Sequence, residues 1–180
     1  MKYLNNVWEI DQRYLANKPE ALGKGSRPHY YVFTLDNGCG VLVPLRSNCA
    51  LHRRDDCFVT EQLKPGETKG RGLDFSKAIL IKETDLSKVI VQKAVINQNQ
   101  FDFIKANKQT IRDGCEKCIN KYIDLAVKNA LHPERVHDRQ RKFLECSTYQ
   151  YFENALKIPE RIEQMRSHEI QKSKVLNKLR

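Results

Sequence analysis

The chain has 180 residues, 40% of them hydrophobic and 30% charged, a balance typical of one soluble globular domain and not of a disordered chain. Lys and Arg outnumber Asp and Glu by 32 to 22, giving a formal net charge of +10. This excess favours a polyanionic partner, nucleic acid above all, over a membrane surface; a basic protein with no such partner is the alternative. No window has the apolar length of a membrane span, and the first residues lack the apolar core of a signal peptide, so we expect an intracellular, cytoplasmic protein.

The first half of the chain predicts an antiparallel sheet. Residues 29–35 are rich in strand formers, and Asp36-Asn37-Gly38 is a hairpin signal because Asn and Gly tolerate the positive φ of a tight turn. Residues 39–45 form the returning strand, in which Pro44 predicts an edge or a bulge. Residues 46–72 are interpreted as a loop.

Three shorter strands are expected, one within that loop and two after it. The segments are residues 57–60, residues 78–81 and, as a strand or a connection, residues 88–96.

The pattern becomes helical near residue 95. Residues 97–129 place apolar side chains on one stripe at the 3.6-residue period, with Gly114 as a weak point. A second helical region follows His132-Pro133 and ends at Pro159. Residues 160–180 form a third, strongly charged helix that either docks or frays. The fold class is therefore α+β: one domain over residues 1–180, mainly sheet and loops over 1–95 and mainly helical over 96–180, with helices flanking the sheet.

The six cysteines are expected to be reduced in an intracellular protein. Cys115 and Cys118 form a CxxC pair, but His137 or Cys146 would have to complete a zinc site at a spacing that fits no standard pattern. We interpret the pair as core residues of a helix. Acidic residues do not cluster as a two-metal nuclease requires, so no metal and no cofactor is expected.

Two polar stretches carry side chains suited to RNA cleavage without a metal. RNA supplies the 2′-hydroxyl nucleophile, and the protein must move protons and stabilise charge on the phosphorus. Arg46, Ser47 and His52 follow the predicted strand, and Asp74, Ser76 and Lys77 lead into the next one. These offer a phosphate-binding fork, a hydroxyl, an acid or base, and orienting groups. Taken alone, each set also fits a solvated loop, a turn cap or a strand-edge lysine.

Together, "RPHYYVFTLDNGCGVLVPLRSNCALH" (27–52) and "RGLDFSKAILI" (71–81) resemble the toxins of type III toxin–antitoxin systems, nearest to the TenpN-like branch of the ToxN/AbiQ superfamily. The resemblance covers roughly the first half of the chain. It implies a compact, twisted antiparallel sheet flanked by helices. It also implies a metal-independent, sequence-selective endoribonuclease that leaves a 2′,3′-cyclic phosphate and acts in abortive infection and phage defence.

The resemblance further implies a partner and a catalytic residue. The partner is a small repeated pseudoknot RNA antitoxin, which assembles with the toxin into a closed protein–RNA oligomer and inhibits it. Ser47 is the residue carried over. In the ToxN branch a lysine follows two residues after this serine, where this chain has Cys49, so Arg46, His52 or Lys77 is expected to supply the positive charge.

Basic and aromatic side chains around these stretches are the expected RNA-binding residues. They are Arg27, Tyr31, Arg53, Arg54, Lys64, Lys69 and Arg71, with Arg161, Arg166, Lys172, Lys174, Lys178 and Arg180 near the C-terminus. Two other function classes stay open. A non-catalytic RNA-binding or ribonucleoprotein assembly module explains the charge equally well, and a DNA-binding regulator is a weaker alternative because no helix-turn-helix is evident.

Overall fold

The computed structural model describes residues 3–16, 27–50, 55–61 and 63–178, with side chains up to residue 172. The strands are β1 (Val7–Ile10), β2 (Pro28–Thr34), β3 (Cys39–Ala50), β4 (Cys57–Val59), β5 (Lys69–Asp74), β6 (Ile79–Lys82) and β7 (Ile90–Lys93). The α-helices are α1 (Gln12–Leu15), α3 (Leu86–Val89), α4 (Gln98–Ala106), α5 (Lys108–Leu131), α6 (Asp138–Cys146) and α7 (Ile158–Lys178). The 3-10 helices are η2 (Phe75–Lys77), η3 (Glu83–Asp85), η4 (Pro133–Arg135) and η5 (Thr148–Tyr151).

The fold is α+β, as predicted, and its centre is a seven-stranded antiparallel sheet in the order β4-β5-β3-β2-β1-β7, with β6 also paired to β3. The long strand β3 organises the sheet. One of its edges pairs with β2; the other pairs first with β6, through Cys39–Leu42, and then with β5, from Leu45 onward. Pro44 stands where this second edge passes from β6 to β5, a position at which a missing N–H costs no ladder hydrogen bond.

The predicted hairpin is confirmed: β2 and β3 pair across a turn in which Gly38 has φ +75°. The predicted loop from residue 46 is wrong in its first part, because β3 continues to Ala50 and pairs with β5. The glycines of β5, which suggest turns in the sequence, allow this pairing. A Cβ on Gly72 would lie 2.4 Å from the Phe58 carbonyl oxygen and 3.0 Å from the Cys49 side chain, so a larger residue would push the strands apart.

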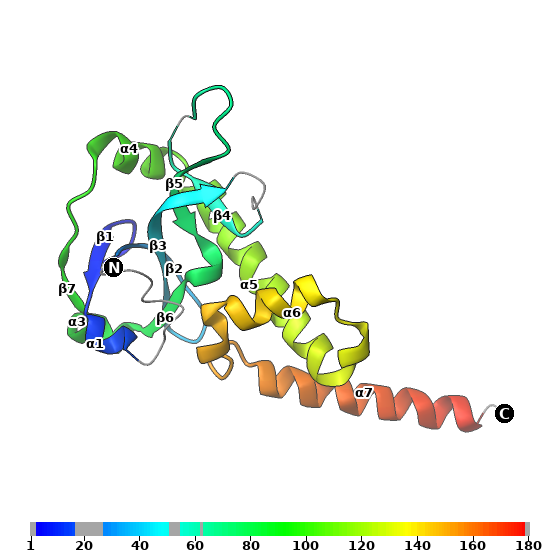
Figure 1. Ribbon diagram of the computed structural model, residues 1–180. Coiled ribbons are helices and arrows are strands. Elements are labelled where there is room, and N and C mark those ends of the chain that lie inside the picture. The colour runs from blue at the N-terminus through cyan, green and yellow to red at the C-terminus, as the bar shows by residue number, and fades with distance from the viewer. Residues whose placement is uncertain (1–2, 17–26, 51–54, 62, 179–180) are drawn as a thin grey trace.

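Helix α5 covers the sheet and builds the core with it (Figure 1). It buries an apolar stripe that includes Ile111, Cys115 and Cys118, confirming the two cysteines as core residues of a helix. The predicted single helix over 97–129 is instead two helices that meet at Asn107, whose side chain bonds back to the Phe103 carbonyl oxygen.

Gly114 lets α5 approach η2 closely, since a Cβ there would meet the Phe75 ring at 2.8 Å. Toward the C-terminus, α7 projects away from the body of the molecule (Figure 1). None of the helices in the described part of the chain is long and apolar enough to cross a membrane.

Candidate active site

A β-bulge in β3 lies at the centre of the candidate site. The β3–β5 register shifts between Arg46, opposite Gly72, and Cys49, opposite Gly70. Three steps along β3 therefore face two along β5, which places one extra residue in β3. Ser47 and Asn48, inside the bulge, are exposed, whereas Cys49 is buried. The bulge thus presents the Ser47 hydroxyl to solvent from within a paired strand, which holds it more rigidly than a loop would.

Arg46 is held by a buried carboxylate on the neighbouring strand. Its Nη1 donates to Oδ2 of Asp74 at 2.5 Å, and the Oγ of Ser76 donates to Oδ1 of the same carboxylate at 2.7 Å. Asp74 and Ser76 are each 3% exposed, while the Arg46 side chain is 31% exposed. Charge-assisted bonds of this kind are strong and directional. The arrangement fixes one side of the guanidinium in the protein and leaves another side open to a ligand.

Arg27 places a second guanidinium within electrostatic range of the same carboxylate. Partial burial lowers the pKa of Arg27, the positive charge of Arg46 lowers it further, and Asp74 opposes both effects. Arg46 is thus bonded to the carboxylate, Arg27 lies within electrostatic range of it, and the two positive charges outweigh the one negative charge. Such a site favours an anion with several acceptor oxygens, such as a phosphodiester.

His29 holds the backbone of Arg27 through a hydrogen bond. It is not among the site residues predicted from the sequence. It is fully buried, and its Nδ1 donates to the carbonyl oxygen of Arg27 at 2.8 Å, which leaves Nε2 as a buried acceptor with no partner among the residues that the structure describes. Burial lowers the pKa of His29 to about 4, partly offset by the bond to Arg27. At neutral pH this imidazole is uncharged and braces the backbone. A histidine between strand residues is most simply a core residue, and its sequence carries no other signal.

Cys49, at the position of the ToxN-branch lysine, contributes no charge. Its side chain is buried against Gly72, and contact with the Cys57 thiol together with burial raises the pKa of Cys49. Among the described residues, Arg46 flanks the bulge on β3, Arg71 lies opposite it on β5 between Gly70 and Gly72, and Arg27 is near enough to Arg46 for its charge to shift the pKa of Arg27.

Ser76 and Lys77 lie on η2, which is held in place by the segment after α6. The hydroxyls of Ser147 and Tyr149 donate to the carbonyl oxygens of Ser76 and Phe75 at 3.0 and 2.7 Å. Lys77 donates from Nζ to the Cys146 carbonyl oxygen at the end of α6. Lys77 is thus placed on the helical side of η2, while Asp74 and Ser76 face Arg46.

Apart from Arg27, the predicted RNA-binding residues separate into four groups. Tyr31 is 1% exposed, and its hydroxyl contacts Thr34 and Glu83, which removes it from any RNA-binding surface; its place in the β2–β3 ladder buries it. Lys64, Lys69 and Arg71 are accessible around β5, with Arg71 beside Glu61.

The remaining expected residues are on α7 or outside the described part. Arg161, Arg166 and Lys172 are exposed on α7, away from the bulge. His52, Arg53 and Arg54, and the side chains of Lys174, Lys178 and Arg180, lie outside the described residues. Within the described ranges, no group of three or more His, Cys, Asp or Glu residues is arranged to hold a metal ion.

No protein-family model matches the sequence, and no curated protein sequence matches it. Solved structures do. AbiQ, a lactococcal anti-phage endoribonuclease of the type III toxin–antitoxin system, superposes with a TM-score of 0.54 over 87% of this chain and 98% of its own, at 11% sequence identity. The chain has the ToxN/AbiQ fold.

ToxN, solved in work on a processed non-coding RNA that regulates a bacterial antiviral system, gives the same assignment. Its TM-score is 0.50, at 17% identity over 66% of this chain and 86% of its own. The high coverage of AbiQ extends the ToxN/AbiQ fold beyond the strands into the helical half, where the sequence carries no recognisable motif.

Proposed function

We propose that this chain is the endoribonuclease toxin of a type III toxin–antitoxin system and that it acts in the cytoplasm. The observation that carries the proposal is the exposed Ser47 hydroxyl in the β3 bulge, next to an Arg46 guanidinium held by buried Asp74. The ToxN/AbiQ fold supports it. Assignment to the TenpN-like branch stays a prediction from the sequence.

The reaction is an internal transfer on RNA. The 2′-oxygen attacks the adjacent phosphorus, a P–O2′ bond forms, the P–O5′ bond breaks, and the product strand ends in a 2′,3′-cyclic phosphate. A base takes the 2′-hydroxyl proton, and an acid protonates the departing 5′-oxygen. No step needs a metal ion or a cofactor.

In this proposal the arginines bind the reacting phosphate. The open side of Arg46, together with Arg27, contacts the non-bridging oxygens and stabilises the charge that builds on them. Ser47 donates to a phosphate oxygen or accepts from the 2′-hydroxyl and so aligns the attack. Asp74 and Ser76, which are buried, are positioning residues that hold Arg46. His52 is proposed to supply the acid or the base, whereas Lys77, whose Nζ donates to the Cys146 carbonyl oxygen on the helical side of η2, is left with a phosphate-binding role.

The proposed inhibitor is the cognate antitoxin RNA, a repeated pseudoknot that occupies the same site and joins toxin copies into a closed protein–RNA assembly. The proposed function of the toxin in the cell is abortive infection and defence against phage.

A non-catalytic RNA-binding module is the second candidate. The observation that favours it is the burial of His29, the imidazole nearest Arg27 in the described residues, since a buried imidazole with a pKa of about 4 makes a poor acid at neutral pH. Such a module needs the arginines but not Ser47.

The two candidates are separated by toxicity in cells that lack the antitoxin RNA. The wild type and Ser47→Ala are expressed from a tightly repressed promoter, with Ser87→Ala, an exposed serine on α3, as the matched control. We expect the wild type and Ser87→Ala to stop growth and Ser47→Ala to permit it. A harmless wild type, or a Ser47→Ala variant as toxic as the wild type at equal protein level, contradicts the proposal.

A further inference from the structure

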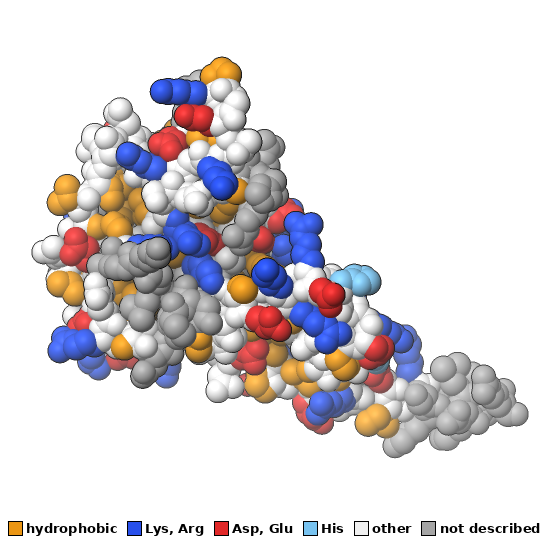
Figure 2. All heavy atoms as spheres, in the orientation of Figure 1, with side chains coloured by type: hydrophobic (Ala, Val, Ile, Leu, Met, Phe, Trp, Pro, Cys, Tyr) orange, Lys and Arg blue, Asp and Glu red, His pale blue; other side chains and the backbone are white. Residues whose placement is uncertain are grey.

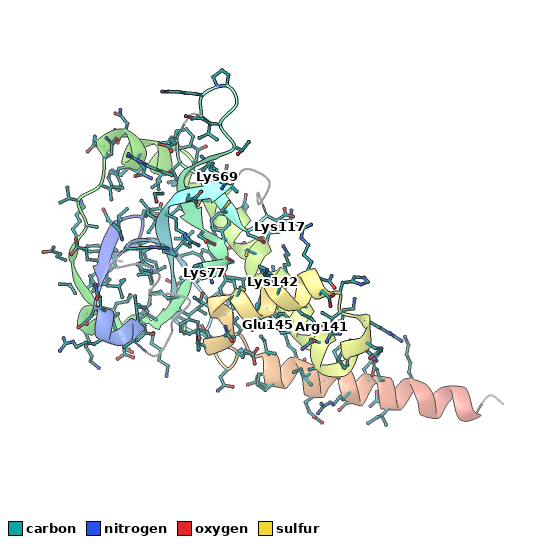
Figure 3. All side chains as sticks on the ribbon, viewed as in Figure 1. Lys69, Lys77, Lys117, Arg141, Lys142 and Glu145 are labelled. Carbon is teal, nitrogen blue, oxygen red and sulfur yellow. The ribbon has the colours of Figure 1, made fainter. Side chains whose placement is uncertain are left out.

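A groove of about 860 Å³ opens between η2 and α6, on the helical side of the candidate site. Ser76 and Lys77 form one wall, α6 forms the other with Arg139, Lys142 and Phe143, and Lys121 of α5 lies between them. Figure 3 shows Lys77 on the sheet side and Lys142 on α6. In Figure 2, Lys and Arg side chains gather in this middle part of the face, where the sheet meets the helices.

The groove favours an anion because four cations, Lys77, Lys121, Arg139 and Lys142, line it against three carboxylates, Asp55, Asp56 and Asp124. Asp56 accepts from Lys121 at 2.8 Å, and Asp55 accepts from Lys117 at 2.8 Å. Arg139 and Lys142 are exposed and make no ion pair within the described residues. These two side chains on α6 are therefore available for phosphate, and Lys77 on the facing wall adds a third positive charge.

One wall of the groove is hydrogen-bonded to the candidate active site. Ser76 lines the groove and donates to Asp74, which in turn accepts from Arg46. One pair of hydrogen bonds to a single carboxylate therefore connects the groove wall to the guanidinium beside Ser47. The groove therefore lies close to Arg46.

The two walls of the groove are tied together, so its shape is built into the fold. Lys77 donates to the last carbonyl of α6, and Ser147, immediately after α6, donates to the Ser76 carbonyl oxygen at 3.0 Å. Phe143 and Leu125 give the groove an apolar surface as well. The groove has the volume of a small-ligand cleft. Proteins that bind single-stranded nucleic acid combine positively charged side chains with aromatic rings.

We propose that this groove binds a single-stranded segment of RNA that flanks the reacting phosphate, with backbone phosphates on Arg139, Lys142 and Lys77. This rests on the proposed endoribonuclease function and adds a second contact region to it. Arg139 and Lys142 bind the flanking segment and take no part in the chemical step.

The test compares Arg139→Gln/Lys142→Gln with Lys82→Gln/Lys108→Gln, a double variant at exposed lysines outside the groove. Affinity is measured by anisotropy on a random-sequence pool of 2′-O-methyl RNA, which lacks the nucleophile and cannot be cleaved. We expect the groove variant to bind about tenfold more weakly and its slope of log Kd against log salt to fall by about 1.4, from two lost single-strand phosphate contacts. The control should change neither, and thermal midpoints should stay at the wild-type value because all four side chains are exposed.

Cleavage of unmodified RNA separates this proposal from the proposed function. At saturating RNA the groove variant should cleave at the wild-type rate, with a raised KM. If affinity and salt slope are unchanged in the groove variant, or fall equally in the control, the groove does not bind the flanking RNA. Cleavage by the wild type would be unaffected by that result. Wild-type protein that never cleaves overturns the proposed function, even where the groove variant binds more weakly.

Discussion

The Nη1 of Arg46 lies 2.5 Å from Oδ2 of Asp74, and the two residues are 28 positions apart in the chain. Strands β3 and β5 bring them together, with Arg46 opposite Gly72 and Asp74 two residues further along β5. Because the carboxylate is buried and the guanidinium is partly open, the pair orients Arg46 toward solvent. The proposed chemistry depends on this orientation.

Asp74→Asn tests whether Asp74 positions Arg46. The amide keeps the shape of the side chain but removes its charge, so Arg46 and Arg27 repel each other without compensation. We expect kcat/KM for RNA cleavage to fall at least about tenfold. The free energy of unfolding should fall by about 1–2 kcal/mol, less than for a fully buried pair because water can reach Arg46. Urea denaturation and initial rates measure both, and Asp102→Asn, at an exposed carboxylate on α4, should change neither.

His29 predicts a dependence of stability on pH. Burial lowers its pKa from 6.5 to about 4 in the folded protein, so between these values the unfolded chain binds a proton that the folded protein does not. Stability is therefore lost as the pH falls below 6.5, by about 2 kcal/mol at pH 5. His29→Gln should remove this part of the pH dependence, measured as the free energy of unfolding at pH 7 and pH 5. His168→Gln, on the exposed face of α7, should retain it. If the free energy of unfolding changes equally with pH in the wild type and in His29→Gln, His29 is not its source.

Gly72→Ala tests the close approach of β3, β4 and β5. The new Cβ would lie 2.4 Å from a backbone oxygen of β4 and 3.0 Å from Cys49, so the strands must separate beneath the bulge. We expect a loss of about 2 kcal/mol or more in stability together with loss of cleavage. Gly66→Ala is the matched control: its φ is +87° but nothing lies near its Cβ, so it should cost only about 1 kcal/mol and leave cleavage intact. An equal effect of the two variants on cleavage would contradict this role of Gly72.

Local signals in the sequence predict the hairpin and several neighbouring elements well. The Asp36-Asn37-Gly38 turn and the strand formers on both sides specify β2 and the start of β3. The second half of β3 could not be predicted in this way, because its partner β5 lies beyond an intervening polar segment and is marked by glycines that suggest turns. The helix break at Asn107 is small and local, and the apolar period continues across it.

The candidate site likewise has residues that the local sequence predicts and a groove that only tertiary packing forms. Arg46, Asp74 and Ser76 were predicted as site residues from two separate stretches, and the structure joins them through one carboxylate. The groove could not be predicted, since Lys77 and the end of α6 are 69 positions apart and meet only through tertiary packing. Tyr31 was misjudged because alternation alone does not say which face of a strand is covered, and here both are.

The most direct test of the account is cleavage by purified protein freed of RNA, with the ends of the products identified. We predict that the wild type cleaves RNA in EDTA to give 2′,3′-cyclic phosphate ends, and that Ser47→Ala, folded to the same thermal midpoint, does not. Cleavage that is lost in EDTA and restored by magnesium, or undiminished cleavage by Ser47→Ala, would contradict the account.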